Sequence, residues 1–455
     1  MSDKAYDDRN NLGGRVRRYA RVGGSVGGLA ARLAGDRLFG MKIDRDDHAI
    51  ELAQALGNLK GPVMKVAQIL STIPDALPKE YAQELAQLQA AAPSMGWTFV
   101  KRRMRTELGE GWRDRFAAFD REASAAASLG QVHKATDPEG RPLAVKLQYP
   151  DMGAAVEADL NQLDWMLGLF RRYDKSVDTS QIREELAERL REELDYALEA
   201  RHIALYRHML ADEPAVHVPA VYPELSTGRL LTMEWLDGTP LMAFTDADQE
   251  TRNTIARNLF RAWYVPFHRY GVIHGDPHLG NYAARDDLSI NLLDFGCVRV
   301  FPPRFCGGVI DLYKALRDGD EALAVAAYEA WGFHNLSREL VETLNIWAAF
   351  LYSPLMEDKP RLINPADNPG QYGAETATKV HKKLKELGPV TPPREFVFMD
   401  RAALGLGGVF LRLGATLNWH QLFHDIVGDF SVEALADRQN QALAAAGMEG
   451  TVDGR

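Results

Sequence analysis

The fold prediction starts from Val272-Ile273-His274-Gly275-Asp276-Pro277-His278-Leu279-Gly280-Asn281 and from Asn291-Leu292-Leu293-Asp294-Phe295-Gly296, which follows it closely. Phosphoryl transfer requires a carboxylate near the attacking hydroxyl and oxygen ligands for the Mg²⁺ that bridges the phosphates of the nucleotide. Asp276, Asn281 and Asp294 offer these groups. For Asp-Phe-Gly alone, a chance turn is an equally good interpretation, so neighbouring motifs must decide.

The spacing of the first stretch agrees with a kinase catalytic loop, whose Asp and Asn are five positions apart, as Asp276 and Asn281 are here. Upstream, Leu143-Ala144-Val145-Lys146 follows a turn at Pro138 to Gly140 and is typical of the strand whose lysine contacts the α- and β-phosphates. Lys146 is therefore the candidate phosphate lysine. The histidines of the first stretch do not predict a metal site, because Gly275-Asp276-Pro277 favours a loop rather than a helix that would present both.

A candidate phosphate loop precedes this strand. It aligns with the kinase pattern G-x-G-x-x-G-x-V, but Ala replaces the first two glycines. Alanine adds a Cβ and limits how closely the backbone approaches phosphates, so we expect the loop to hold nucleotide differently from that of an ordinary protein kinase. The nucleotide-binding candidates in this loop are Ala125, Ala126, Ala127, Ser128, Gly130 and Val132.

A candidate adenine-binding hinge lies in Leu231-Thr232-Met233-Glu234-Trp235-Leu236-Asp237-Gly238, which ends a predicted strand and turns at the glycine. Backbone groups from Glu234 to Leu236 are positioned to read the adenine edge, with Met233 beside them. Without the neighbouring motifs, an edge strand followed by a turn explains this stretch equally well.

Composition excludes several classes of protein. The 455 residues are 46% hydrophobic and 25% charged, which is typical of a globular chain and excludes wholesale disorder. The net charge of −10 argues against general nucleic-acid binding. The two cysteines, Cys297 and Cys306, suit neither a zinc site nor a disulfide scaffold and favour a reducing compartment. The apolar run from Ala402 to Leu411 is about half the length that spans a bilayer, so no transmembrane helix is predicted.

The hydrophobic periodicity predicts alternating helical and strand-rich regions. Helices are expected over 46–108 and 151–210, a hairpin over 116–147, and further strands over 216–235. From residue 245 onward the pattern is helical, apart from a loop and short strands between His274 and Val300.

The phosphate lysine needs an acidic partner on a helix, and the residues alone leave this choice open. The candidates are Glu157, Asp159, Asp164 and Glu199, the last on a charged helix predicted over 184–201.

Several of these motifs, in this order, resemble the UbiB/AarF atypical kinase family. They are Ala-Ala-Ala-Ser-Leu-Gly-Gln-Val-His at 125–133, Ala-Val-Lys-Leu-Gln-Tyr-Pro at 144–150, Glu-Leu-Asp-Tyr-Ala-Leu-Glu-Ala at 193–200, and the stretch at 274–281. The resemblance implies an α+β, two-lobed protein-kinase-like fold, ATP binding, and a supporting role in ubiquinone biosynthesis through ATPase or small-molecule phosphoryl transfer. It also implies Glu199 as the lysine's partner, and Glu193 and Asp195 as the family's Glu-x-Asp motif.

The family's Lys-x-Gly-Gln motif is similar to Lys65-Val66-Ala67-Gln68 here. Lys65 and Gln68 are three positions apart and share one helical face, so both can project over the active site. Ala67 departs from the family glycine and stiffens the helix, which alters the geometry of this gate. Charge and periodicity predict a basic flexible leader over 1–45 and a helical extension over 46–115, and the resemblance implies a kinase-like N-lobe over 116–237 and a C-lobe with a helical tail over 238–455.

The leading functional hypothesis is an ATP-dependent atypical kinase or ATPase. Asp276 positions or deprotonates the acceptor, and Asn281 and Asp294 hold Mg²⁺. The alternatives are a small-molecule phosphotransferase of the aminoglycoside or choline kinase type, which uses a similar catalytic loop, and a nucleotide-sensing scaffold without turnover. The expected partners are quinone-precursor lipids or quinone-biosynthesis enzymes, and the expected location is the cytoplasm.

The leader adds a membrane hypothesis. Residues 1–43 contain nine Lys or Arg and four Asp, against the sign of the whole chain. This segment is interpreted either as a solvated leader or as a peripheral contact with an anionic inner membrane surface.

Overall fold

The computed structural model describes residues 95–127, 129–150, 152–153, 156–157, 187–188, 190–364, 373–387 and 393–451. The leader and nearly all of the predicted helical extension, with Lys65 and Gln68, lie outside these residues. The chain divides into two compact units. Described residues of 95–99, 122–132 and 148–194 belong to the smaller unit, and those of 100–121, 133–147 and 195–451 belong to the larger one.

In the smaller unit, β2 (Ala125–Ala127) pairs antiparallel with the first residues of β3 (Gly130–Thr136), and Ala125 lies opposite Val132. The side chain of Gln131 is fully buried and holds the backbone of Met95: its Oε1 accepts from Met95 N at 2.6 Å, and its Nε2 donates to Met95 O at 3.1 Å. The strand therefore anchors the residue at which the described chain begins.

The larger unit contains the main sheet, whose strands follow in the order β1-β3-β4-β6. The predicted hairpin turn is confirmed: Gly140 has φ +85°, and the buried Asp137 carboxylate accepts hydrogen bonds from Arg141 N and Nε. Next to it, β4 pairs antiparallel with β6 and sets Lys146 opposite Leu231. The remaining strand bounds are Ala118–Phe119 for β1, Pro142–Gln148 for β4 and Leu230–Glu234 for β6.

The helix predicted over 184–201 is not continuous, and this expectation was wrong. Helical residues end at Glu192, a turn follows at residues 193–194, and α8 (Tyr196–Met209) begins after Asp195. The Asp195 side chain accepts a hydrogen bond from Leu198 N at 2.9 Å. Because a capping Asp satisfies the unpaired N–H groups of a first turn, it starts a new helix here. Glu199 therefore lies in the first turn of α8.

Short strands flank the catalytic-loop candidate and the Asp-Phe-Gly segment of the larger unit. β8 (Val272–His274) pairs antiparallel with β11 (Val298–Val300). A second sheet has the order β5-β10-β9-β7, and its strands are Val216–His217, Ile290–Leu292, Tyr282–Ala284 and Thr239–Pro240. The strands and loop expected between His274 and Val300 are thus confirmed.

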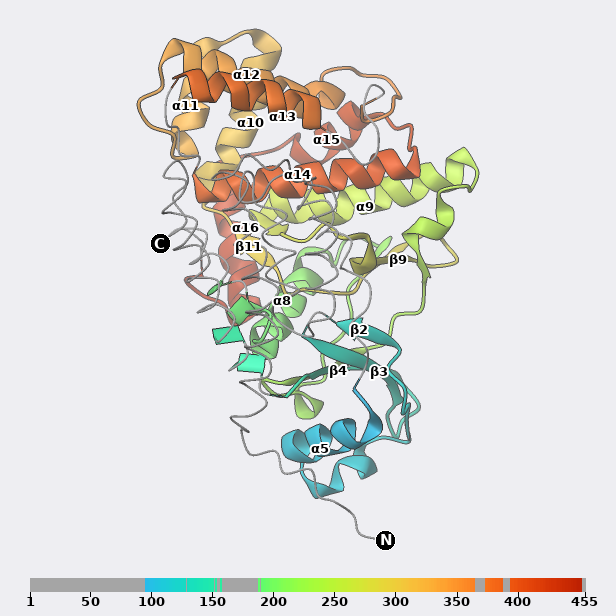
Figure 1. Cartoon of the computed structure of the whole chain (residues 1–455). Helices are drawn as coiled ribbons and strands as arrows, with labels where there is room; N and C mark the ends of the chain where they lie inside the picture. Colours follow the sequence, from blue (N-terminus) through green and yellow to red (C-terminus); the bar gives the residue numbers. More distant parts are fainter. Residues whose placement is uncertain are drawn as a thin grey trace, which may run out of the picture. The chain divides into compact units, whose positions relative to one another are not determined.

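The rest of the larger unit is helical, as predicted. α9 (Gln249–Tyr270) begins at its cap Asp248 and ends at Gly271, whose φ of +65° suits glycine. Figure 1 shows α14 (Arg394–Leu413) running along α9. The other α-helices are α5 (Trp97–Leu108, whose first three residues lie in the smaller unit), α10 (Pro303–Asp318), α11 (Glu321–Ala330), α12 (Arg338–Tyr352), α13 (Ala374–Leu387), α15 (Trp419–Val427) and α16 (Val432–Ala445). The 3-10 helices are η2 (Glu110–Arg115), η3 (Pro223–Leu225), η4 (Leu241–Phe244), η5 (Leu279–Asn281) and η6 (Ser353–Leu355).

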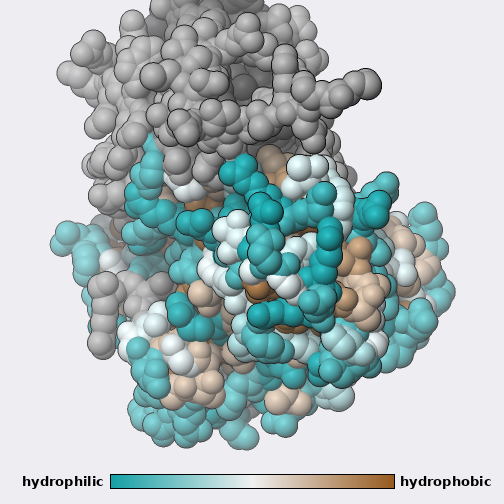
Figure 2. Space-filling model, turned by 90° about the horizontal axis from the view of Figure 1, so that it is seen from below, coloured by the Kyte–Doolittle hydropathy of each residue, from teal (hydrophilic) through white to brown (hydrophobic). Residues whose placement is uncertain are grey.

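Hydrophobic side chains are mostly buried. On the face drawn in Figure 2, the described residues are largely hydrophilic and hydrophobic ones form small scattered patches. The large hydrophobic side chains exposed within the described ranges are Met95, Met242 and Leu387. Among the helices of these ranges, none combines the length and apolarity needed to span a bilayer.

Candidate active site

A buried ion pair joins β4 to α8. Lys146 Nζ lies 2.6 Å from Glu199 Oε1 and 2.9 Å from Oε2. Lys146 is 8% exposed and Glu199 is 3% exposed. The ring of Tyr196, one helical turn before Glu199, lies 5.3 Å from the same ammonium. Of the acids left open by the sequence, Glu157 pairs instead with Arg191 at 2.9 Å, and Asp159 and Asp164 lie outside the described residues.

The electrostatics of this pair are set by burial and by three charges. Burial by itself would lower the pKa of Lys146, but the carboxylates of Asp294 and Glu199 outweigh it and raise that pKa well above its usual value. Burial raises the pKa of Glu199, and the Lys146 ammonium opposes this shift. The lysine therefore remains charged and fixed in place, as a phosphate-binding ammonium must.

Asp294 completes this cluster. Its Oδ2 accepts from Lys146 Nζ at 3.2 Å and its Oδ1 accepts from Gly296 N at 3.0 Å, while the side chain stays 38% exposed. The next residue, Phe295, is fully buried, with its ring 5.3 Å from that of Tyr206 on α8. The Asp-Phe-Gly segment thus has its phenylalanine in the core and its carboxylate at the lysine.

Two buried histidines hold the backbone of this segment. His202 on α8 donates from Nδ1 to Phe295 O at 2.9 Å, and burial lowers the pKa of His202 to about 4. His274 donates from Nε2 to Asp294 O at 2.6 Å and accepts from Asp276 N on Nδ1 at 3.2 Å. These partners assign a neutral His274 with its proton on Nε2. His274 therefore connects the catalytic-loop candidate directly to the Asp-Phe-Gly backbone.

The loop itself is closed by hydrogen bonds to one carbonyl. Asn281 Nδ2 and the Tyr282 hydroxyl both donate to Asp276 O, at 3.2 Å and 3.3 Å. Gly275 N donates to Cys297 O at 2.6 Å, and a Cβ at position 275 would lie 2.5 Å from Cys297 Sγ. Close contact with the residue after Asp-Phe-Gly is therefore the reason for glycine at this position.

The predicted metal ligands have suitable chemistry for Mg²⁺, which prefers oxygen donors from one or two side chains plus the phosphates. The Asn281 amide nitrogen is used to close the loop, which leaves its amide oxygen for a cation, and the Asp294 carboxylate is partly exposed. Within the described residues, no three His, Cys, Asp or Glu side chains gather into a metal site made by protein alone. Asn281 and Asp294 therefore stay the candidate Mg²⁺ ligands.

The phosphate-loop candidates lie in the smaller unit, whereas Lys146 belongs to the larger one. Ala125, Ala126 and Ala127 form β2, Gly130 and Val132 lie on β3, and Ser128 is outside the described residues. The loop is thus a tight β-hairpin whose first strand consists of alanines.

The hinge candidate follows β6, with Met233 buried and Leu236 half-buried. Two N–H groups expected to face adenine are used by the protein instead, because Glu234 N donates to Ala220 O and Trp235 N donates to Pro142 O. Among described residues, no backbone acceptor pairs with Leu236 N. Of the three N–H groups in the predicted hinge, the one left for a base is that of Leu236.

The Glu-x-Asp motif lies at the break before α8. Asp195 is exposed and caps the helix, and Glu193 is half-buried in the preceding turn. Lys65 and Gln68, which the sequence predicts to project over the active site, are outside the described residues, so this gate stays a prediction.

Two residues of the site, Tyr196 and His202, and one residue of the smaller unit, Gln131, were not predicted from the sequence. Tyr196 and His202 lie on α8 at positions i−3 and i+3 from Glu199, which places all three on one helix face. That spacing would have pointed to them once Glu199 was chosen. No such signal pointed to Gln131, because the group it binds is the backbone of Met95, which lies 36 positions away in the sequence.

Comparisons with known proteins identify relatives of this chain. A family model described as the ABC1 atypical kinase-like domain matches residues 87–328. The mitochondrial atypical kinase COQ8 of Saccharomyces cerevisiae is 29% identical over 84% of this chain and 76% of its own length. The mitochondrial atypical kinase COQ8B of Rattus norvegicus is 30% identical over 98% of this chain and 86% of its own.

A solved structure of Rv3197 with erythromycin, from Mycobacterium tuberculosis, is 28% identical, covers 84% of this chain and 96% of its own, and superposes with a TM-score of 0.59. Fold and sequence therefore agree, and the resemblance seen in the motifs is confirmed. This chain belongs to the ABC1 atypical kinase-like family, with the COQ8 and UbiB kinases.

Proposed function

We propose that this protein binds ATP with Mg²⁺ and catalyses ATP hydrolysis or phosphoryl transfer to a small molecule in support of isoprenoid quinone biosynthesis. The observation that carries the proposal is the buried cluster in which Lys146 Nζ contacts Glu199 at 2.6 Å and Asp294 at 3.2 Å. A lysine held by a helix glutamate beside the Asp-Phe-Gly carboxylate is the arrangement that phosphoryl transfer requires. Membership of the COQ8 group supports the link to quinone biosynthesis.

In this proposal each group has one role. Lys146 binds phosphate oxygens, Glu199 orients Lys146, and Asn281 and Asp294 hold Mg²⁺, which supplies charge neutralisation at the phosphates. Asp276 positions or deprotonates the acceptor: its backbone is fixed by Asn281 and Tyr282, and within the described chain no group hydrogen-bonds its carboxylate. Leu236 N donates to the base, and the residues of the alanine hairpin at 125–132 stay phosphate contacts proposed from the sequence pattern.

The second candidate is a small-molecule phosphotransferase without a link to quinones. It is favoured by one specific observation, that a structural relative was solved in complex with erythromycin. Under this alternative the acceptor is a soluble hydroxyl compound and Asp276 keeps its role.

The decisive experiment measures Mg-dependent ATP consumption with and without anionic liposomes, phenolic quinone precursors and hydroxylated antibiotics. The proposal expects turnover that rises with liposomes and precursor, and that falls at least about a hundredfold in Asp276→Asn, since general base contributions are of this size. Asp294→Asn should lose Mg-dependent nucleotide binding in a thermal-shift titration while remaining folded. Stimulation by the antibiotics alone would favour the second candidate, and binding without turnover would indicate a nucleotide-sensing scaffold.

A peripheral membrane contact through the basic leader is part of the proposal. Anionic leaflets attract each nearby Lys or Arg by about 1 kcal/mol, and residues 1–43 carry nine of them. Such a contact would bring the catalytic cluster near lipid-embedded quinone precursors.

A further inference from the structure

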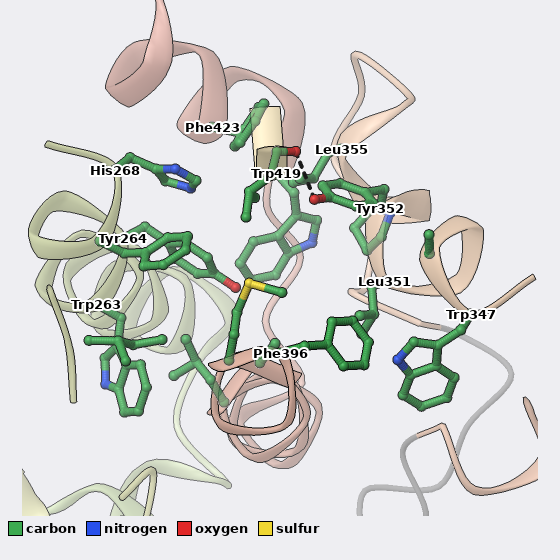
Figure 3. A pocket seen from close by; sticks show the side chains of 18 of the residues that line it. Trp263, Tyr264, His268, Trp347, Leu351, Tyr352, Leu355, Phe396, Trp419 and Phe423 are labelled. Carbon is green, nitrogen blue, oxygen red and sulfur yellow. Dashed lines mark hydrogen bonds between the residues drawn. The ribbon is translucent and has the colours of Figure 1, made fainter. Parts of the chain in front are cut away.

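The larger unit contains an apolar cavity of about 110 Å³ among its C-terminal helices. Figure 3 shows aromatic side chains from several helices pointing into it, among them Trp347, Tyr352, Phe396, Trp419 and Phe423. The residues that line it include no Asp, Glu, Lys or Arg. The chemistry of its wall therefore suits an uncharged, largely apolar ligand.

Most polar atoms in this wall are hydrogen-bonded to the surrounding protein. Trp347 Nε1 donates to Asp400 Oδ1 at 2.5 Å, and the Tyr352 hydroxyl donates to Val309 O at 2.8 Å. Trp419 Nε1 donates to Arg361 O at 2.9 Å. These groups are satisfied and do not need a ligand.

Tyr264 and His268, one turn apart on α9, differ from most of the wall, and the neighbouring Trp263 Nε1 is likewise buried without a hydrogen-bond partner among the described residues. Figure 3 shows the Tyr264 hydroxyl directed into the cavity, with the His268 ring on the same side. Within the described part of the chain, His268 Nδ1 is fully buried and has no hydrogen-bond partner, whereas Tyr264 is half-buried and its hydroxyl makes no hydrogen bond to these residues. Burial lowers the pKa of His268 to about 3 and raises the pKa of Tyr264 to about 12, so both are neutral near pH 7.

Unpaired buried polar groups are costly, and native proteins usually satisfy them with protein, water or ligand. Apart from Trp263 Nε1, the rest of this wall offers a water few additional polar partners, although a bound water makes about three hydrogen bonds. A ligand with one hydroxyl or carbonyl group and an apolar body satisfies the Tyr264 hydroxyl and fills the remaining space. The ligand has no more than one ring, because an apolar cavity of about 150 Å³ in another protein accepts benzene and this cavity measures about 110 Å³.

From these observations we infer that the cavity is a binding site for a small, uncharged, single-ring molecule with one hydrogen-bonding group, and that α14 connects its occupancy to the catalytic loop. The binding part does not depend on ATP turnover or on the function proposed above.

Helix α14 contacts the cavity with one face and the catalytic-loop candidate with another, and this connects the two. Phe396, Met399, Ala403 and Leu406 line the cavity at three- and four-residue spacing. From another face, Arg401 Nη2 donates to Gly275 O at 3.1 Å. A Cβ at Gly405 would lie 2.2 Å from Pro277 Cγ, so the helix backbone packs directly on the loop.

A second connection is direct. Ile273, which also lines the cavity, precedes His274 in the chain. A ligand that fills the cavity stiffens α14 and β8 and thereby restrains the segment that contains Asp276.

Binding is tested with the full chain and two matched probes, 4-fluorobenzyl alcohol and 4-fluorotoluene, whose affinities are measured by fluorine NMR. We expect both to bind. Tyr264→Phe should weaken the alcohol about fivefold, the effect of one hydrogen bond, and leave the toluene within twofold. Ala403→Leu, which fills the space, should abolish both. Tyr270→Phe, on the same helix but outside the cavity wall, is the control and should change neither.

The connection is tested by hydrogen exchange of a peptide covering 272–281. The fluorobenzyl alcohol should slow exchange in the wild type and in Tyr270→Phe, and should have no effect in Ala403→Leu. Absence of binding, or binding that Tyr264→Phe and Ala403→Leu both leave unchanged, would overturn the site. Binding without any change in exchange at 272–281 would overturn the connection, whatever the outcome of the ATPase assays.

Discussion

Lys146 and Glu199 are 53 positions apart in the sequence, and their charged groups are 2.6 Å apart in the core of the larger unit. The pair joins β4 of the main sheet to the first turn of α8. Asp294, in the Asp-Phe-Gly segment, contacts the same Lys146 ammonium. Three segments that are distant along the chain thus share one buried charge cluster, and its energetics lead to the first prediction.

Glu199→Ala should lower the free energy of unfolding by about 3 kcal/mol, because it leaves the Lys146 ammonium buried with only Asp294 nearby. The double variant Lys146→Met/Glu199→Ala should lose less than the sum of the losses in Lys146→Met and Glu199→Ala, since neither charge is then left unpaired. Urea denaturation measures both. Glu157→Ala, which breaks an exposed pair with Arg191, serves as control and should cost less than about 1 kcal/mol. Additive losses would show that the two charges are not coupled.

Gly275→Ala should destabilise the protein by about 1 to 3 kcal/mol, because the new Cβ would lie 2.5 Å from Cys297 Sγ. The added Cys297→Ala change removes that sulfur and should restore more than half of the loss in a thermal melt. Gly228→Ala, with no atom within 4 Å of its Cβ, should be nearly neutral. A double variant no better than Gly275→Ala alone would mean that the backbone, not the sulfur, requires glycine.

Asp400 should make stability depend on pH. Burial raises the pKa of Asp400 to about 7, above its value of 3.8 in an unfolded chain. Between these two values the folded state holds the proton more tightly, so its contribution to stability is full below pH 3.8 and is lost as pH rises to 7. Asp400→Asn should therefore gain stability over the wild type by about 2 kcal/mol between pH 4 and pH 7.5, as measured by urea denaturation. The exposed Asp212→Asn should show no such pH-dependent gain, and a gain of equal size there would refute the assignment.

The basic leader gives a prediction about membranes. Removal of residues 1–43 should reduce co-flotation with cardiolipin-containing liposomes, because nine Lys or Arg are lost with it. The shortened protein should also bind independently of salt, since screening acts on the charges that were removed. Equal flotation of both forms at low salt would show that the leader makes no membrane contact.

Lys65 is predicted to pair with the Glu-x-Asp motif and to close the acceptor side of the site against bulky peptides. Lys65→Ala and Glu193→Ala should each change ATP turnover, and the double variant should resemble either one, because the interaction is lost only once. Asp195 caps α8, so Asp195→Ala should also lower stability by about 1 kcal/mol. Fully additive effects of Lys65 and Glu193 on turnover would show that no such pair exists.

The catalytic-loop and Asp-Phe-Gly residues could be identified from the sequence because their chemistry depends on local spacing. Asp276, Asn281 and Asp294 lie within two short segments, and the turn before Lys146 is specified by Asp137 and Gly140. The acidic partner of Lys146 was harder to identify from the sequence, because several acids were equally plausible until a family resemblance selected Glu199. Periodicity also missed the break at residues 193–195, since a charged stretch gives no signal for the Asp195 cap.

By itself, then, the sequence determined the fold class, the order of the motifs and the identity of the groups able to handle phosphate and Mg²⁺, because spacing within one segment is a local property. Only the tertiary structure decided which acid faces Lys146, that His202 and His274 hold the Asp-Phe-Gly backbone, and that Tyr264 faces an apolar cavity. Those contacts join segments tens to more than a hundred residues apart, and burial of a polar group becomes specific only when all surrounding elements are packed.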